Sequence, residues 1–359
     1  MSRRHKVIAL FLFFVALLGL RMTALAADTE YQAPKLEQEE GWTLVVMPDP
    51  QQYTSQRNFP ILEIMMNWLV ENKAPLNIRQ VVCVGDLVNN NMSNKEWSFS
   101  SQAFARLDGH YPYVLCTGNH EYGHTTATAD NRKTAFNEHY PSSRNPAWKD
   151  ILVGMGKNTF GEETLENAVY ELTLPEGNLF VFIAIPFSPP EESLRWAKEV
   201  AEQPKYDNDK TIVALVTHDY MKPAQWNNVV SSDKDYTLHK EGGASGQEIW
   251  EKLIKPCKNI RMVFCGHYSD VNNPRGCSGF RTDKNDAGRT VYQMVFDTQA
   301  LGGGYNGNGG DGWLRLLEFS RDMKHVKVKS FSPFFALSPS TQNRAWGTEP
   351  YNQFEFDIE

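Results

Sequence analysis

Five short apolar runs recur along the chain, and each one stops abruptly at residues that can bind a metal ion. The runs are rich in β-branched side chains and apolar on both faces, which is typical of strands buried in a layered α/β structure. They cover residues 43–47, 81–84, 113–116, 211–216 and 262–265. Apolar residues at helical spacing lie between them, for example Ile61, Met65 and Leu69. This alternation predicts parallel strands joined by helical crossovers.

Polar side chains follow each of the five runs. The carboxyl ends of parallel strands open on one side of a sheet, where ligands bind, so we expect the five clusters to converge on one crevice. A single Asp or His after a strand is more typical of a turn or a structural role, but an ordered set of five favours a metal site. The clusters contain Asp49 and Gln51, then Asp86 and Asn89, then Asn119, His120 and Glu121, then His218 and Asp219, and finally His267, Ser269 and Asp270.

Divalent cations explain these residue types. A bound cation offsets negative charge on a substrate and lowers the pKa of a bound water from about 15.7 toward neutrality. A carboxylate such as Asp86 offers two oxygens and a compensating negative charge. Neutral imidazoles such as His218 and His267 suit Zn²⁺, Mn²⁺ or Fe.

The clusters resemble the signature of the calcineurin-like metallophosphoesterases, namely Asp-x-His, Gly-Asp-x-x-(Asn or Asp), Gly-Asn-His-(Asp or Glu), His and Gly-His-x-His. The resemblance runs from near residue 43 to near residue 270 and implies hydrolysis of phosphate esters at two metal ions. It implies that Asp86 bridges the metals and that His120 protonates the leaving alkoxide or stabilises the phosphoryl charge. The other implied ligands are Asn119, His218 and His267 at one metal and Asp49 at its neighbour. Asn89 stands at the usual partner position beside the bridging Asp, and Asp219 or Glu121 is a candidate support for His120.

Two positions depart from the family pattern, and both belong to the same metal. Gln51 stands in place of the first His, and Ser269 in place of the last. The site held by Asp49 is thus left with oxygen donors, including the carbonyl of Gln51, and oxygen favours Mn²⁺, Mg²⁺ or Ca²⁺. We therefore predict an asymmetric pair, with Mn, Zn or Fe held firmly at the His-rich site and a weaker, oxygen-ligated neighbour. Asp270 is a candidate replacement ligand.

The predicted function is an exported, metal-dependent hydrolase of phosphate monoesters or diesters. Retention of Asp86 and His120 favours activity, because a purely structural metal needs neither. The alternative is a catalytically degenerate relative whose Asp49 site is empty and which binds carbohydrate or another surface. Nine tryptophans and fourteen tyrosines are enough to line a sugar site, although most such residues belong to the core or to scattered surface.

The N-terminal sequence and the net charge indicate where the protein acts and on which kind of substrate. Residues 1–26 read as a signal peptide, with a basic start, an apolar run and small residues before a cleavage point. No later run is long enough to span a membrane, so we expect an exported protein, periplasmic or extracellular. The net charge of −7 comes with scattered Lys and Arg, which disfavours binding of long nucleic acid. A monomer acting on a small phosphorylated substrate is the resulting expectation.

The predicted architecture is a four-layer α/β/β/α sandwich, in which two mixed β-sheets pack face to face with helices outside. We divide the chain into a signal peptide (1–26), an N-terminal linker (27–40), a metallophosphoesterase domain (41–335) and a C-terminal tail that packs on the domain (336–359). The tail is predicted as surface coil in which Phe354 and Phe356 seal an edge. Residues 124–167 are expected to form an irregular wall of the crevice, and residues 221–245 a second wall. Among five cysteines, Cys257 and Cys277 are candidates to pair.

Overall fold

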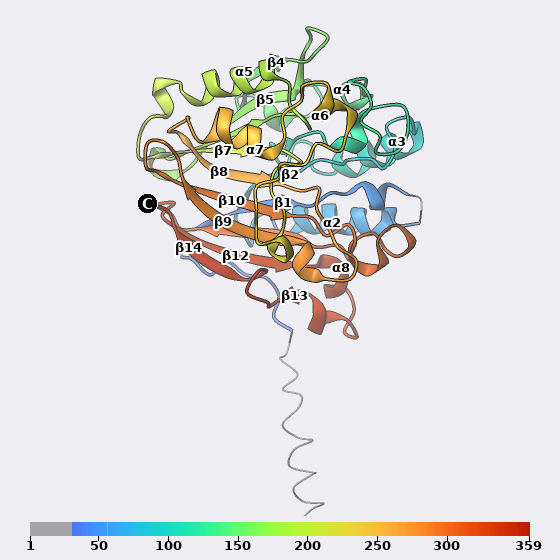
Figure 1. Ribbon diagram of the computed structural model, residues 1–359. Helices are drawn as coiled ribbons and strands as arrows, with labels where there is room; N and C mark the ends of the chain where they lie inside the picture. The colour runs from blue at the N-terminus through green and yellow to red at the C-terminus, as the bar shows by residue number, and fades with distance from the viewer. Residues whose placement is uncertain (1–30, 56) are drawn as a thin grey trace, which may run out of the picture.

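A computed structural model describes residues 31–55 and 57–359, and it contains two seven-stranded sheets (Figure 1). The predicted signal peptide and the first part of the predicted linker lie outside the described residues. Among the described residues no helix has the length and apolar character needed to cross a membrane.

The first sheet joins the start of the chain to its end. Strands β1 (Trp42–Met47), β2 (Ile78–Cys83) and β3 (Val114–Leu115) pair in parallel. On the other side of β1 the chain adds an antiparallel series, β11 (Leu314–Phe319), β12 (His325–Phe331) and β13 (Trp346–Gly347), and β14 (Phe354–Asp357) also pairs with β12. In Figure 1 the red C-terminal strands β12 and β14 therefore lie in the same sheet as the N-terminal strand β1.

The second sheet is built from the middle of the chain, in the order β4, β5, β6, β7, β8, β10, β9. Its parallel centre consists of β6 (Leu179–Ala184), β7 (Thr211–Val216), β8 (Ile260–Cys265) and β10 (Thr290–Phe296). Antiparallel strands β4 (Leu152–Lys157), β5 (Glu163–Thr173) and β9 (Ser278–Lys284) flank this centre. The parallel strands carry nearly unbroken apolar sequences because both of their faces are covered.

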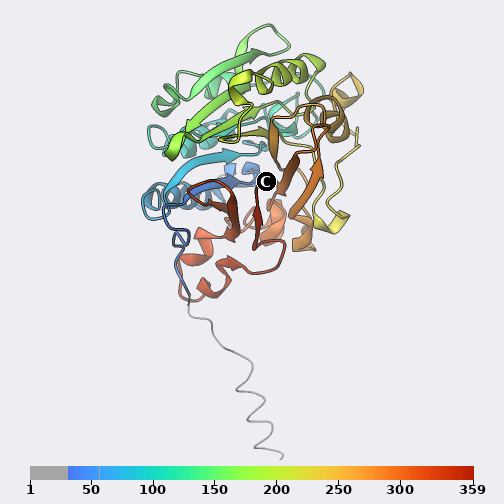
Figure 2. The ribbon, with the colours of Figure 1, turned by 90° about the vertical axis from the view of Figure 1, so that its left-hand side faces the viewer.

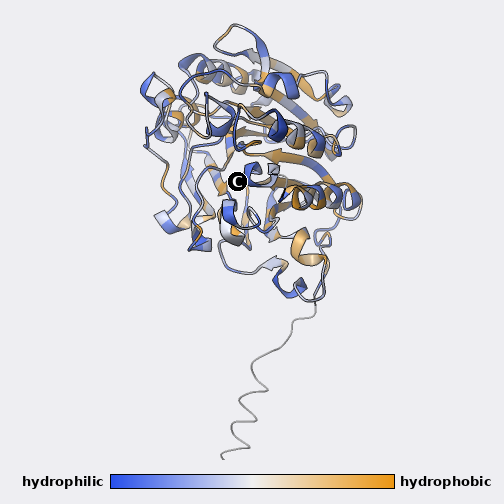
Figure 3. Ribbon diagram, turned by 90° about the vertical axis from the view of Figure 1, so that its right-hand side faces the viewer, coloured by the Kyte–Doolittle hydropathy of each residue, from blue (hydrophilic) through white to orange (hydrophobic). Residues whose placement is uncertain are grey.

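The two sheets pack face to face through a core rich in aromatic rings. Trp42 of β1 stacks on Phe319 of β11, with ring centroids 4.7 Å apart, and both rings meet Phe180 of β6 edge-on. Hydrophobic residues are prominent on the strands and also occur on helices, whereas the surrounding loops are mostly hydrophilic (Figure 3). The larger core cluster contains residues from both sheets, as a sandwich requires.

Helices cover the outer faces and complete four layers (Figure 2). Helix α2 (Phe59–Glu71) packs on the first sheet, where Trp68 meets Phe331 of β12, and α3 (Asn94–Phe104) lies beside it. Helix α5 (Glu191–Ala201) and α7 (Gly246–Ile249), which continues as the π-helical turn η7 (Trp250–Ile254), bury their apolar sides against the second sheet. The predicted α/β/β/α sandwich is confirmed.

The remaining helices are short and lie in connections. They are α4 (Phe136–His139), α6 (Thr237–Lys240) and α8 (Pro333–Ala336), with 3₁₀ turns η1 (Gln51–Thr54), η2 (Asn119–Glu121), η3 (Pro146–Trp148), η4 (Pro175–Gly177), η5 (Pro204–Tyr206), η6 (Ala224–Trp226), η8 (Pro274–Gly276), η9 (Leu301–Asn306) and η10 (Gln342–Arg344). Two of these turns, η1 and η2, directly follow strands β1 and β3 and carry residues of the predicted site.

Three expectations need correction. Residues 124–167 are not wholly irregular, because they contain α4 and the edge strand β4. The C-terminal residues are not surface coil, because β13 and β14 extend the first sheet. Phe356 does close an edge as expected, stacking on Phe280 and Tyr292. Cys257 and Cys277 are both buried free thiols and do not pair.

Candidate metal centre

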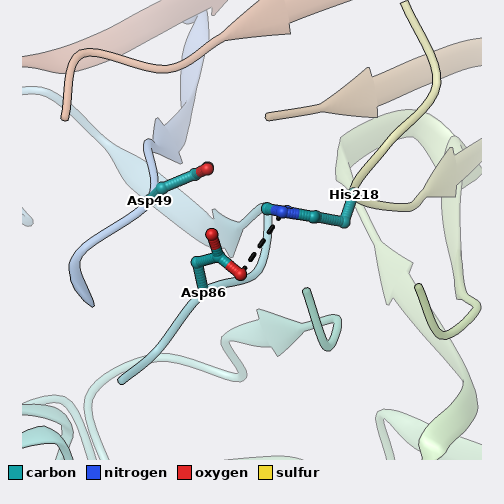
Figure 4. Close-up of side chains that lie close together, drawn as sticks. All are labelled: Asp49, Asp86 and His218. Carbon is teal, nitrogen blue, oxygen red and sulfur yellow. Dashed lines mark ion pairs between the residues drawn. The ribbon is translucent and has the colours of Figure 1, made fainter. Parts of the chain in front are cut away.

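The carboxyl ends of β1, β2 and β7 bring three predicted ligands together at one edge of the sandwich. Asp49, Asp86 and His218 are fully or almost fully buried, and they offer ligand atoms that all lie within 4.8 Å of one another. Figure 4 shows the side chains of these residues approaching from separate segments, with the ion pair between Asp86 and His218 marked. The Nε2 atom of His218 lies 3.3 Å from Oδ1 of Asp86.

Asn119 and His267 complete the His-rich half of the site. The Oδ1 atom of Asn119 lies 3.1 Å from Nε2 of His218 and 2.9 Å from Nδ1 of His267, and the two imidazole nitrogens are 3.2 Å apart. The other ring nitrogen of His218, Nδ1, is 2.7 Å from the carbonyl oxygen of Val84. Because a carbonyl only accepts, Nδ1 carries a proton, and Nε2 is the ring nitrogen that faces the cluster. Three donor atoms that suit a cation of intermediate softness, such as Zn²⁺ or Mn²⁺, therefore lie close together.

The backbone is bent to allow this convergence. Asp86 and His267 both adopt positive φ angles, 53° and 74°, which few non-glycine residues do. Such strain is typical of functional sites, where surrounding contacts hold it in place. Gly118 and Gly266 are required by close approach, since a Cβ on them would lie 2.1 Å from Oδ1 of Asp86 and of Asp49, respectively. The glycines in the sequence motifs therefore make room for the carboxylates.

The buried charges shift one another's pKa values in the way a cation site requires. Burial opposes ionisation of Asp86, but the facing His218 and His120 lower its pKa overall. Burial likewise opposes charge on His218, yet the carboxylates of Asp86 and Asp49 raise its pKa well above the ordinary value. Burial and the neighbouring Asp297 raise the pKa of Asp49 strongly. The cluster therefore needs positive charge, which a bound divalent cation would supply in place of protons.

The oxygen-rich half contains Asp49 and Gln51. Oδ2 of Asp49 accepts a hydrogen bond from the backbone N–H of His267 at 2.9 Å, while its Oδ1 is buried without a hydrogen-bond partner among the described residues. The Nε2 atom of Gln51 lies 3.0 Å from Oδ2 of Asp86, and its Oε1 is also buried and unpartnered. Buried polar atoms are rarely left unpaired, so these two oxygens mark a place for a ligand.

His120 stands at the open side of the cluster. Its Nδ1 atom lies 2.7 Å from the backbone carbonyl oxygen of Asn89, and its Nε2 atom lies 3.8 Å from Oδ2 of Asp86. The residue at position 89 therefore contributes its carbonyl group to the site. Glu121 and Asp219, which were expected to support His120, instead make hydrogen bonds and contacts with other residues, so that expectation was wrong.

Glu121 supports the loop that carries Asp86. Its buried carboxylate accepts hydrogen bonds from the backbone N–H groups of Gly118, Asp86 and Val88 at 2.7, 2.9 and 3.1 Å. Burial and the charge of Asp86 raise the pKa of Glu121 to about 8. Asp219 instead lies behind His267, with its Oδ2 3.9 Å from Nε2 of that imidazole and equally far from Nε2 of His239.

Ser269 and Asp270 are not brought to the cluster. The hydroxyl of Ser269 donates to the carbonyl oxygen of Asp297 at 3.1 Å and accepts from the N–H of Ala300 at 3.1 Å. Asp270 accepts hydrogen bonds from Gln225 and from the N–H of Asn272. Asp270 therefore orders an external loop, whereas Ser269 anchors the segment that follows β10.

That segment carries two site residues that the motif search missed, Asp297 and Gln299. Asp297 is fully buried at the end of β10, where burial raises its pKa to about 6. Nε2 of Gln299 donates to Oδ2 of Asp297 at 2.9 Å and lies 3.4 Å from Oδ2 of Asp49. The signal was present, because the apolar run of β10 ends in Asp-Thr-Gln as the other site strands end in polar clusters. Asp-Thr-Gln is not part of the five motifs given above, so only the pattern of a buried strand followed by polar residues could have identified it.

Aromatic side chains wall the His-rich half. Phe187, which follows β6, lies 6.0 Å from the ring centroid of His218, and Tyr236 lies 5.8 Å from that of His267. His239 packs against both aromatic rings. Residues 221–245 thus contribute a wall, as expected. An apolar wall limits water around the imidazoles, which strengthens their interaction with a cation.

These donors fit a divalent metal ion. Two imidazole nitrogens, an amide oxygen and a carboxylate suit Mn²⁺, Zn²⁺ or Fe, and the adjoining oxygens of Asp49 and Gln51 suit a harder cation. The sequence profile described as calcineurin-like phosphoesterase matches residues 43–268, most of the chain. The chain therefore belongs to the calcineurin-like phosphoesterase family, and its domain is a metal-dependent phosphoesterase domain.

Individual proteins resemble the chain more distantly. The uncharacterized protein YvnB of Bacillus subtilis is 28% identical over 301 residues, which cover 82% of this chain and 20% of that protein. The chain thus spans about a fifth of that relative. Among solved structures, the purple acid phosphatase PPD1 from yellow lupin (Lupinus luteus) is 14% identical with a TM-score of 0.48, over 90% of this chain and 55% of that one. GAP50 of Plasmodium is 11% identical with a TM-score of 0.45, over 89% of each chain.

Proposed function

We propose that the protein is an exported hydrolase that cleaves a small phosphate ester at two divalent metal ions. The observation that carries the proposal is the convergence of Asp86 with Asn119, His218 and His267 on one side and with Asp49 and Gln51 on the other. A carboxylate between two sets of donors is the arrangement that a metal pair needs. Bound ions would offset the charge of the phosphoryl group and lower the pKa of an attacking water.

Asp86 and His120 have different roles in the proposed reaction. Asp86 has one carboxylate oxygen toward His218 and the other toward Gln51, so it can serve both halves. His120 has its Nδ1 proton held by the carbonyl of Asn89, which leaves Nε2 at the open side of the cluster. In its protonated form Nε2 can donate to the leaving oxygen or to a phosphoryl oxygen, and such general acids contribute roughly 10²–10⁴ in rate.

Several features support a small substrate and export. The net charge is −7 and basic residues are scattered, so no basic stripe is available to track a polymer. The N-terminal sequence, with its basic start, apolar run and small residues before position 27, supports secretion. Separation of a producing culture into cytoplasmic and exported fractions tests this part, and a protein that stays cytoplasmic with residues 1–26 intact would overturn it.

Hydrolysis assays test the chemistry. The protein without residues 1–26 is treated with a chelator and assayed on p-nitrophenyl phosphate and bis-p-nitrophenyl phosphate, with and without Mn²⁺. We expect turnover that depends on added metal and disappears in Asp86→Ala, and the preferred ester directs the substrate search. Absence of turnover with Mn²⁺, Mg²⁺, Ca²⁺, Zn²⁺ and Fe²⁺, in a protein that binds a single metal, would overturn the proposal and favour a non-catalytic binding protein.

A further inference from the structure

We propose that Gln299 is a ligand of the second metal ion and replaces an imidazole that this chain lacks. The inference rests on the proposed metal pair and identifies a residue outside the family motifs. In the motif pattern two His would bind beside Asp49, and here Gln51 and Ser269 occupy those positions. Gln299 reaches the same half of the site from the segment that follows another strand, β10.

The orientation of the Gln299 amide is determined by Asp297. The carboxylate accepts from the backbone N–H of Gln299 and from its Nε2, both at 2.9 Å. Because a carboxylate only accepts, the nitrogen of the amide must face Asp297, and Oε1 must face the opposite way. There Oε1 meets the side-chain amide of Gln51. Asp297 thus turns the amide oxygen of Gln299 toward Gln51, while the amide nitrogen also lies 3.4 Å from Oδ2 of Asp49.

The side-chain amide of Gln51 can adopt two orientations that exchange its nitrogen and its oxygen. Its Nε2 lies between two oxygens, Oδ2 of Asp86 and Oε1 of Gln299, while its own Oε1 is buried and unpartnered among the described residues. The two ends of an amide are nearly isosteric. A half-turn would place three oxygens together, an arrangement that repels without a cation and is favourable around one. Unpartnered Oδ1 of Asp49 adds a carboxylate to the same half.

Ser269 holds in place the turn that brings Gln299 to the site. Its hydroxyl bonds to the carbonyl oxygen of Asp297 and to the N–H of Ala300, the two residues that bracket the turn carrying Gln299. The position that holds an imidazole in the motif therefore anchors the loop that delivers a substitute oxygen. Amide and carboxylate oxygens select Ca²⁺, Mg²⁺ or Mn²⁺ over softer metals.

Metal binding tests the proposal independently of hydrolysis. Chelator-treated protein is titrated with Mn²⁺ by calorimetry, and the loaded protein is examined by electron paramagnetic resonance for coupling between two Mn²⁺ ions. We expect two binding events and a coupled signal in the wild type. Gln299→Leu should keep the tighter event, weaken the second at least roughly tenfold, and lose the coupled signal, in line with loss of a ligand or its close support.

Control variants separate a ligand from a packing residue. Gln293→Leu removes a buried amide of β10 whose partners are Tyr220 and Asp283 and not the cluster, and it should retain both events. If Gln299→Leu does not fold, loss of the second event in the milder Gln299→Asn, whose melting temperature confirms folding, supports the proposal.

The outcomes distinguish this inference from the proposed function. Two unchanged binding events in Gln299→Leu would overturn the role of Gln299, and so would a wild type that binds one ion. Either result is compatible with metal-dependent hydrolysis by the wild type, which would still support the phosphoesterase. Absence of any metal binding would overturn both.

Discussion

The Nδ1 atom of His120 lies 2.7 Å from the backbone carbonyl oxygen of Asn89. A carbonyl accepts only, so this contact fixes the tautomer of the imidazole and directs Nε2 into the site. Asn89 is itself held, because Oε2 of Glu96 accepts from its backbone N–H at 2.8 Å. The catalytic candidate is therefore oriented by the backbone of a loop that begins at Asp86.

His120→Ala is expected to lower kcat by roughly 10²–10⁴, the usual contribution of a general acid. Metal content should stay at the wild-type level, because His120 is not among the converging ligand atoms. Kinetics on esters with leaving groups of different pKa check the role, since the loss should be smallest for the most acidic leaving group. An equal loss on every ester would argue against proton donation by His120.

Asp86→Asn is expected to weaken binding at both halves of the site, because the carboxylate faces His218 on one side and Gln51 on the other. Activity should fall below detection, and metal analysis after dialysis should find less than one ion per chain. The fold should survive, as judged by circular dichroism, since the variant keeps the size of the side chain. Wild-type metal content in Asp86→Asn would contradict a bridging role.

Glu121→Ala is expected to destabilise the protein, because it leaves the N–H groups of Gly118, Asp86 and Val88 without their acceptor. An unpaired buried donor costs about 1–3 kcal/mol, so the total free energy of unfolding should fall by several kcal/mol. Urea denaturation measures the loss. Glu96→Ala serves as a control, since Glu96 also accepts from two backbone N–H groups but is partly exposed.

The stability of the metal-free protein is expected to fall as pH rises from about 5 to above 8. Burial and Asp86 raise the pKa of Glu121 to about 8, whereas an unfolded Glu titrates near 4.3. The folded state therefore binds more protons across that window, so this contribution is complete below about 4.3 and is lost as pH rises through the folded pKa.

Melting temperatures at several pH values check this dependence. Glu121→Gln, which does not titrate, should show a shallower decline than the wild type. Saturation with Mn²⁺ should also reduce the slope, because a cation beside Asp86 cancels the repulsion that raises the pKa of Glu121. A metal-free protein whose melting temperature rises steadily over this range would contradict the assignment.

Reducing agent is expected to leave the melting temperature unchanged. All five cysteines are buried free thiols, and Sγ of Cys277 lies 3.4 Å from the hydroxyl of Ser269. Mass analysis of unreduced peptides should find Cys257 and Cys277 as thiols. A linked peptide, or a clear drop in melting temperature with dithiothreitol, would show that a disulfide forms after all.

Local sequence patterns predicted most of the core strands because their side chains are buried on both faces. The runs at 211–216 and 262–265 match or fall within β7 and β8. The edge strand β4 was missed, because two glycines interrupt its apolar residues Leu152, Val153 and Met155 and leave no regular alternation. Strands β13 and β14 were missed because they have only two and four residues, so their local pattern is too short to predict a strand without the pairing to β12.

By itself, the sequence predicted the family and the sandwich fold. It also predicted Asp49, Asp86 and His218, which the structure brings together, because metal chemistry restricts which side chains can follow each strand. Only the tertiary structure decided how those residues are supported. In the tertiary structure Glu121 accepts hydrogen bonds from the loop that carries Asp86, and the carbonyl group of Asn89 orients His120. Ser269 anchors the segment that carries Asp297 and Gln299. Hydrogen bonds between residues that are far apart in the sequence produce no regular spacing of residue types. These contacts therefore depend on how the two sheets pack and cannot be predicted from local sequence patterns.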